Sequence, residues 1–147
     1  MGARRKGREL AVQALYQIEA RGGSSAEMLR LFWEQADAGA RAREFAATLV
    51  AGVDEHRQRI DELIAAASEH WRFERLSAVD LGVLRVATYE LLQHEAPTSV
   101  ILDEAIEIAR RFGTTESAVF VNGVLDHIAG QLGVKEPAAE RNVRNDG

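Results

Sequence analysis

The densest cluster of side chains that could do chemistry is a run of positive charge near the N-terminus. Four cations lie within five residues, with no acidic residue among them: Arg4, Arg5, Lys6 and Arg8. Guanidinium groups bind phosphate through paired hydrogen bonds and stack on bases, so the run predicts contact with a polyanion such as a nucleic acid. Gly7 weakens helix formation, and we expect this arm, residues 1–8, to be extended and to become ordered on binding. Short basic runs also arise by chance at termini, so the run alone leaves nucleic-acid binding open.

A second cluster consists of three carboxylates on one predicted helix: Asp103, Glu104 and Glu107. Asp103 and Glu107 are four residues apart and share a helix face, where they could bind a metal ion or act as an acid–base pair. Glu107 is also four residues before Arg111, with which it could form an ion pair. Because charged helix surfaces are ordinary, we favour a solvated surface over a site.

Residues for other chemistries are missing from the sequence. The absence of Cys excludes disulfides, thiolate zinc sites and cysteine nucleophiles. There is no Walker phosphate loop, no Gly-rich dinucleotide fingerprint and no Gly-x-Ser-x-Gly elbow. The four His residues are scattered, and no two have the spacing of a helical metal site. We therefore expect no enzyme activity, no cofactor and no metal.

The elements that must position these groups are predicted to be helices. Apolar residues recur with helical period along almost the whole chain, and no alternating run indicates a strand. The pattern predicts about seven helices, with clear segments at 5–20, 57–68 and 78–93. Segment 78–93 is apolar over more than half of its circumference, so it should be the central helix. The fold class is all-α.

Several polar residues are predicted to fix the helix ends. Ser77 and Asp80 have the form of a capping box, with Asp in the place usually held by Glu or Gln. We expect Thr98 or Ser99 to cap the next helix, and Thr114 or Thr115 to start the last one. Gly residues at 113 and 133 are expected to end these two helices.

Length and charge indicate one domain with an uneven charge distribution. The 147 residues are 46% hydrophobic and 28% charged, which fits a soluble globular domain over residues 1–133 with a disordered polar tail at 134–147. Residues 1–21 carry a charge of +3, and the remainder carries −8. An acidic body with a basic arm favours a local contact with a short strand over coating of a duplex. No apolar window could span a membrane and no secretory signal is evident, so we expect a cytoplasmic protein.

Three stretches, in this order, resemble the NusB family of transcription antitermination factors. They read RRKGRELAVQALY at 4–16, LSAVDLGVLRVATYELL at 76–92 and LDEAIEIARRFGTTESAVFVNGVLDHI at 102–128. The last is the most specific, and residues 22–43 match only in helical pattern. The resemblance implies two small three-helix bundles packed across each other, and RNA binding without catalysis.

The resemblance also implies partners. NusB-like proteins join the ribosomal protein NusE, and the pair binds the single-stranded boxA element of nascent ribosomal RNA. With other Nus factors, the complex helps RNA polymerase to read through terminators. Some members form homodimers that mask the RNA surface, so a homodimer is one expected state.

Seven residues match RNA-binding positions of the family, and we add Gln13, three residues before Tyr16, because its amide could hydrogen-bond a base edge. The eight candidates are Arg4, Arg5, Lys6, Arg8, Gln13, Tyr16, Glu116 and Phe120. Alternatives from the sequence remain open for the last four. Tyr16 could equally form the edge of the core, and Gln13 is more simply a solvated side chain. Glu116 could have no role beyond stabilising the helix N-terminus, and Phe120 could be a core residue because it continues an apolar stripe. Val119 stands where relatives often carry Lys, so the cation for one phosphate contact is missing from this sequence.

Acidic residues match the side of the family that faces NusE, namely Glu74 and Asp80. A basic ribosomal protein would complement them. Asp80 can both cap its helix and meet the partner only if one carboxylate oxygen stays free. We expect Arg85 and Glu90 to belong to a structural network that links the two bundles.

Two other functions compete with antitermination. A similar helical module precedes the catalytic domain of some ribosomal-RNA cytosine methyltransferases, although this sequence has no Gly-rich cofactor loop. The other is a homodimeric scaffold without a role in RNA binding.

Overall fold

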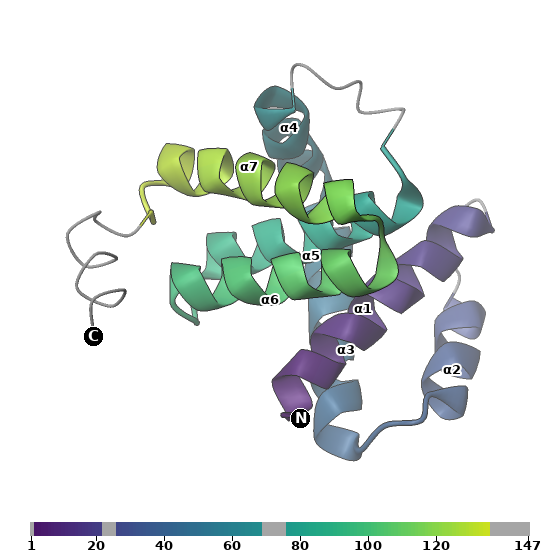
Figure 1. Cartoon of the computed structure of the whole chain (residues 1–147). Helices are drawn as coiled ribbons and strands as arrows, with labels where there is room; N and C mark the ends of the chain where they lie inside the picture. The colour runs from purple at the N-terminus through teal and green to yellow at the C-terminus, as the bar shows by residue number, and fades with distance from the viewer. Residues whose placement is uncertain (1, 22–25, 69–75, 136–147) are drawn as a thin grey trace.

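The computed structural model describes residues 2–21, 26–68 and 76–135, and all regular structure in this part of the chain is helical. The helices are α1 (Ala3–Ala20), α2 (Ala26–Gln35), α3 (Ala40–Glu55), α4 (Arg57–Ala67), α5 (Ala78–Gln93), α6 (Thr98–Phe112) and α7 (Thr115–Leu132). The predicted all-α class and the expected helices are confirmed (Figure 1). None of the described helices is both long enough and apolar enough to cross a bilayer.

Two groups of helices share α5 as their common support (Figure 1). In the first group α1 packs along α3, with α2 at its edge. In the second group α6 and α7 pack against each other and against α5, and α4 lies against α5 and α7. Because α5 contacts α1, α3, α4, α6 and α7, it fixes the position of α1 relative to α7.

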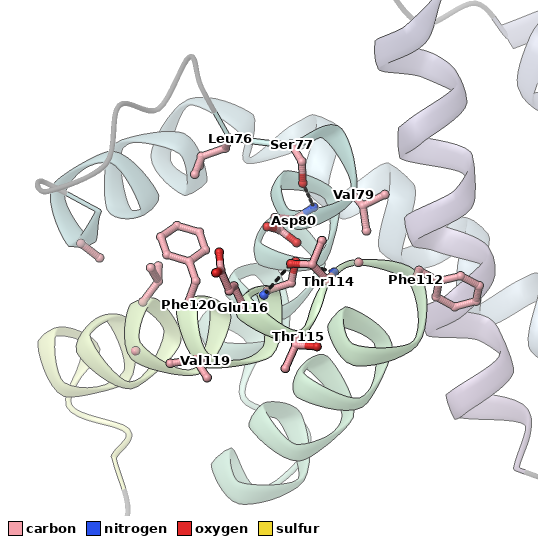
Figure 2. A pocket seen from close by; sticks show the side chains of 15 residues that line it. Leu76, Ser77, Val79, Asp80, Phe112, Thr114, Thr115, Glu116, Val119 and Phe120 are labelled. Atoms are coloured by element: carbon pink, nitrogen blue, oxygen red, sulfur yellow. Dashed lines mark hydrogen bonds between the residues drawn. The ribbon is translucent and has the colours of Figure 1, made fainter.

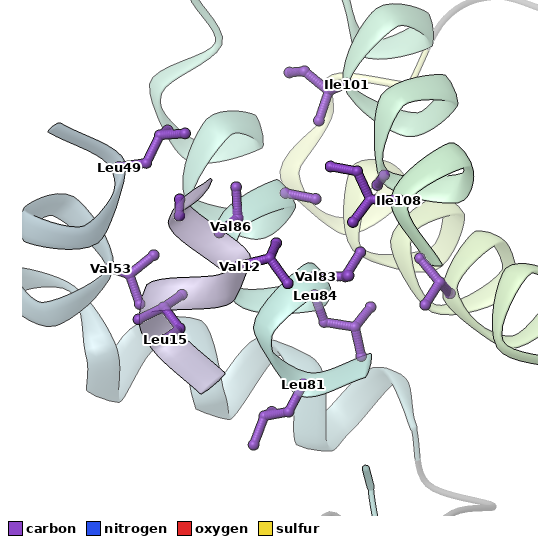
Figure 3. Close-up of a cluster of buried hydrophobic side chains, with 14 of the residues drawn as sticks. Val12, Leu15, Leu49, Val53, Leu81, Val83, Leu84, Val86, Ile101 and Ile108 are labelled. Carbon is purple, nitrogen blue, oxygen red and sulfur yellow. The ribbon is translucent and has the colours of Figure 1, made fainter. Parts of the chain in front are cut away.

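The composition of α5 explains its central place. Most of its residues are buried, and Leu84 and Leu91 are almost inaccessible to solvent. Its side chains meet Val12 and Leu15 of α1 on one side and Ile108 of α6 on the other (Figure 3). Burying a side chain of this size stabilises the fold by about 1.5–3 kcal/mol, so the shared core holds both groups together.

The basic arm is helical rather than extended, which corrects the prediction. α1 begins at Ala3, and Gly7 lies buried within it. A Cβ at Gly7 would be 2.8 Å from Cδ2 of Phe45, so glycine lets α1 approach α3 closely. Packing outweighs the cost of glycine in a helix, which is about 1 kcal/mol. The arm is therefore fixed to the body.

Side-chain caps define the starts of α5 and α7. Thr114 and Ser117 form a capping box at α7, with backbone-to-hydroxyl distances of 3.2 Å and 3.0 Å. At α5 only half of the predicted box forms: the Asp80 N–H donates to Ser77 Oγ at 3.0 Å. No return bond from the Asp80 carboxylate to Ser77 is present among the described residues.

The start of α6 differs from the prediction. Pro97 stands at the cap position, and the Thr98 hydroxyl donates to the Val134 carbonyl at 2.6 Å instead of capping the helix. The expected Gly residues do end α6 and α7. Val134 and Lys135 are held to α7, by a backbone bond to Ala129 and an ion pair to Asp126. The rest of the predicted tail, 136–147, lies outside the described residues.

Candidate nucleic-acid interface

Arg8, one of the four cations of the arm, is buried. Its guanidinium donates to both carboxylate oxygens of Glu90 on α5, at 2.8 Å and 2.9 Å, and both residues are buried. The Phe45 ring of α3 lies 5.5 Å from the same guanidinium. Arg8 therefore holds α1 against α5. The sequence predicted a structural role for Glu90, but it predicted that Arg8 binds RNA.

Arg5 has one carboxylate partner and keeps much of its surface. Its Nε and Nη2 donate to Glu104 of α6 at 2.9 Å and 2.8 Å. The arginine is half exposed, whereas Glu104 lies mostly covered behind it. The hydrogen bond from Arg5 lowers the pKa of Glu104 below its ordinary value. The outward end of this pair is therefore cationic.

Arg4 and Lys6 are the two other cations of the arm. Arg4 is exposed and lies 4.7 Å from the Phe45 ring, and Lys6 is half-buried. Within the described part of the chain, neither side chain has a carboxylate at ion-pair distance. At about 100° per residue, the two side chains leave α1 on nearly opposite sides. The arm therefore presents its charge over a wide arc.

One face of α1 brings together three of the predicted RNA-binding residues, Lys6, Gln13 and Tyr16. Their spacing of seven and then three residues places them along one side of the helix. Gln13 is exposed, and Tyr16 is 47% exposed, which is unusual for an aromatic side chain. We call these three residues the α1 face. Its chemistry suits a nucleic acid: a cation, an amide that can pair with a base edge, and a ring that can stack.

A groove of about 1100 Å³ lies where the start of α5 meets the junction of α6 and α7 (Figure 2). We call it the α7 groove. Its polar lining includes Ser77, Asp80, Thr114 and Glu116, and its apolar lining includes Leu76, Phe112, Val119 and Phe120. The volume suffices for an unstacked base, and the mixture of rings and hydrogen-bonding groups matches single-strand recognition.

Phe120 and Glu116, the predicted RNA-binding residues of α7, both line this groove (Figure 2). Phe120 is half-buried and packs against the core as well as lining the groove, so its core contact is confirmed and its role at an RNA surface stays a prediction. Glu116 is exposed in the first turn of α7. Val119 is exposed beside Phe120 and offers no charge at that position.

Asp80 carries an unusual oxygen. Its Oδ1 is buried and has no hydrogen-bond partner among the described residues, and its side chain lines the α7 groove (Figure 2). A buried carboxylate oxygen without a donor costs about 1–3 kcal/mol or more, so a cation entering the groove would be stabilised there. The other residue predicted to face a partner, Glu74, lies outside the described residues.

Two of the three carboxylates of the predicted α6 cluster are used in ion pairs. Glu104 binds Arg5, and Glu107 binds Arg110 at 3.0 Å. The expected pair between Glu107 and Arg111 is wrong, because Arg111 reaches across to Glu9 of α1. No group of three or more His, Asp or Glu side chains able to hold a metal ion occurs in the described segments.

Arg85 lies in a structural network, as predicted. Its guanidinium donates to both oxygens of Asp61 on α4 at 2.9 Å and 3.0 Å, and Glu19 of α1 lies 3.6 Å away. Sequence reasoning missed Phe45 as the aromatic ring beside Arg4 and Arg8. No local signal could have identified it, because the contact joins helices that are distant in sequence.

The α1 face and the α7 groove are neighbours. Arg111, near the end of α6, donates to Glu9 of α1 at 2.7 Å, and the next residue, Phe112, lines the groove. Figure 1 shows this end of α6 beside the middle of α1. Five of the predicted RNA-binding residues thus lie on connected surface: Lys6, Gln13, Tyr16, Glu116 and Phe120.

Comparison with known proteins gives consistent matches over most of the chain. The model of the NusB family matches residues 5–130. The transcription antitermination protein NusB of Geobacter sulfurreducens is 50% identical over 134 residues, covering 90% of this chain and 97% of the relative. The same protein of Sorangium cellulosum is 47% identical over 134 residues, covering 90% and 96%.

Solved structures agree in fold. NusB of T. maritima is 40% identical and superposes with a TM-score of 0.79, covering 95% of this chain and 96% of that one. A crystal structure of antitermination factors NusB and NusE in complex with dsRNA contains a chain that is 25% identical, with a TM-score of 0.77 and coverage of 88% and 97%.

Proposed function

Because the chain belongs to the NusB family, we propose that it is a transcription antitermination factor that binds single-stranded boxA RNA together with the ribosomal protein NusE. In this role it acts with other Nus factors on RNA polymerase and helps the polymerase to read through terminators while it synthesises ribosomal RNA. The proposal assigns it no catalytic step. A factor that meets a nascent transcript works in the cytoplasm of a bacterium.

The observation that carries the RNA part of the proposal is the junction of the α1 face with the α7 groove. Lys6 and the outward guanidinium of Arg5 attract phosphates, and Tyr16 and Phe120 offer rings to unstacked bases. Arg8 supports the site from behind by fixing α1, since its own charge is buried against Glu90. Because Arg8 is buried, three of the four arm cations remain for RNA, and the arm neutralises at most three phosphates.

The protein partner is proposed to approach the Asp80 side of the groove. A basic ribosomal protein carries the donor that the buried Asp80 oxygen lacks. Glu74 stays a proposed partner residue on the basis of the family resemblance. NusE bound there would lie beside the RNA surface and extend it with its own basic groups.

A titration with a fluorescent boxA oligonucleotide tests the proposal, with and without NusE. Tyr16→Ala removes an exposed ring, and we expect it to weaken RNA binding about tenfold, because base stacking contributes about 1–3 kcal/mol. Asp80→Asn should weaken RNA binding in the presence of NusE more than RNA binding by the protein alone, because the buried oxygen is proposed to meet the partner. Arg59→Ala, a change to an exposed cation of α4, is the control.

Two results would contradict the proposal. One is a wild-type protein that binds boxA RNA neither alone nor with NusE. The other is equal binding to boxA RNA and to an oligonucleotide of scrambled sequence in the presence of NusE. Sedimentation with and without RNA separates the scaffold alternative, for which a dimer would persist and bind no RNA.

A further inference from the structure

The α1 face contains a carboxylate that should repel RNA. Glu9 lies three residues after Lys6 and four before Gln13, on the same side of the helix. Its side chain is only 5% exposed, so its charge lies beneath the surface that Lys6, Gln13 and Tyr16 form. A phosphate crossing this face would meet a negative potential unless a cation covers Glu9.

Arg111 is that cation. Its Nη1 donates to Glu9 Oε1 at 2.7 Å, and its side chain is 53% exposed. The carboxylate therefore lies beneath and the guanidinium lies outside, so the pair presents its positive end to solvent although its total charge is zero. The guanidinium has further N–H donors beyond the one used for Glu9, and a phosphate can accept from them.

Phe112 gives the guanidinium a fixed orientation. The Arg111 Cζ lies 5.3 Å from the centre of the Phe112 ring, within the range of a cation–π contact. Phe112 also lines the α7 groove. Arg111 is thus held from two sides, by Glu9 on α1 and by the ring at the groove, at the point where the two surfaces meet.

The neighbouring arginine shows the difference. Arg110 bonds to Glu107 on its own helix, and both side chains are exposed, at 61% and 52%. Both charges of this pair face solvent, so they cancel at the surface. Arg110 and Arg111 are neighbours on α6 and carry the same charge, but only Arg111 presents to solvent a positive charge that its partner does not cancel there.

We propose that Arg111 binds a backbone phosphate of the RNA and carries the strand from the α1 face to the α7 groove, with Glu9 as its positioning residue. This inference rests on the proposed function and adds a residue to its RNA site. It also places one of the contacts on α6, outside the arm.

Two double variants of equal charge test the role of Arg111. Glu9→Gln/Arg111→Gln removes the guanidinium, leaves no lone buried charge and keeps the net charge of the protein. Glu107→Gln/Arg110→Gln makes the same chemical change one residue away and is the control. Both are titrated with single-stranded boxA RNA over a range of salt concentrations, and thermal melting checks that each is folded.

We expect the Glu9/Arg111 variant to bind about tenfold more weakly, the size of one charge-assisted hydrogen bond. Its salt slope should be smaller by about 0.7, the value of one phosphate on a single strand. The control should stay within about twofold of wild type, since an exposed pair contributes little. If the double variant melts early, both double variants are titrated at a lower temperature at which each is folded.

The inference would be overturned if the Glu9/Arg111 variant bound RNA with the same affinity and the same salt slope as the wild-type protein. In that case Tyr16→Ala tests the proposed function separately, and a loss of RNA affinity in this variant would still support that function. Equal losses in both double variants would also overturn the inference, because they would reflect general electrostatics. If the wild-type protein binds no RNA, both the role of Arg111 and the proposed function are contradicted.

Discussion

Arg4 and Arg8 are one helical turn apart and both lie near Phe45, yet their surroundings give them different roles. Arg4 is exposed, whereas Arg8 is buried in a two-bond ion pair with Glu90. The sequence predicted both as phosphate contacts, because neither composition nor spacing says which arginine meets a carboxylate. Glu90 is 82 residues away in sequence, so only the packing of α1 on α5 brings the pair together.

Removing the buried charge should destabilise the protein. We expect Arg8→Met to lower the free energy of unfolding by about 3–5 kcal/mol, because Glu90 would be left buried without its partner. Urea unfolding measures the change. Arg8→Met/Glu90→Leu should recover much of it, and Arg4→Ala should cost less than about 1 kcal/mol. A loss in the single variant no larger than that of Arg4→Ala would show that the pair is not buried in solution.

The ion pair between Arg5 and Glu104 should make stability depend on pH. Since Arg5 lowers the pKa of Glu104 in the folded protein, the pair stabilises the fold fully above the ordinary glutamate pKa. This contribution is lost as the pH falls through the lowered value and the carboxylate is protonated. We therefore expect Glu104→Gln to lower the melting temperature at pH 7 and to leave it unchanged in strong acid. A constant difference between the two proteins at every pH would contradict this assignment.

Helix periodicity predicted the elements well because each helix has a continuous apolar stripe that packs against a neighbour. The central position of α5 followed from its apolar circumference, and the structure surrounds it with five helices. Local capping was less predictable. Thr98 has the residue type of a cap, but its hydroxyl bonds to Val134 of the segment after α7, a contact that no local pattern encodes.

The crossing of α3 and α5 depends on a glycine. A Cβ at Gly52 would overlap the ring of Tyr89, so the two helices approach over this position. We expect Gly52→Ala to destabilise the fold by about 1–3 kcal/mol, as overpacking does, measured by urea unfolding.

Gly130 of α7 provides the matched control for this substitution, because a Cβ there meets nothing within 4 Å. Gly130→Ala should leave stability unchanged or raise it by up to about 1 kcal/mol, since alanine favours the helix. If both substitutions had the same effect, the close packing of Tyr89 on Gly52 would be refuted.

At the scale of the whole molecule, the acidic body carries a local cationic surface at the arm. Three arm cations remain outward after Arg8 is paired inside, so the arm should give a salt slope for single-stranded RNA of about −2 at most. A fluorescence titration at several salt concentrations measures this slope for Glu9→Gln/Arg111→Gln, which lacks the Arg111 contact and leaves no uncovered charge at Glu9. A slope of zero would exclude the arm from RNA binding.

The connection between the α1 face and the α7 groove could not be read from the sequence. The resemblance to the NusB family pointed to Tyr16 and Phe120 separately, but they are more than a hundred residues apart. Their common surface arises because α5 holds α1 on one side and α7 on the other. The side-chain bond between Arg111 and Glu9 then joins the end of α6 to α1.

A map of amide chemical shifts on adding single-stranded boxA RNA to the isotope-labelled protein tests this common surface most directly. The largest shifts should fall along the α1 face at Lys6, Gln13 and Tyr16, and in the first turns of α7 around Glu116 and Phe120. They should appear together as RNA is added, because one strand would contact both. Shifts confined to one of the two surfaces, or centred on α2, would contradict the account.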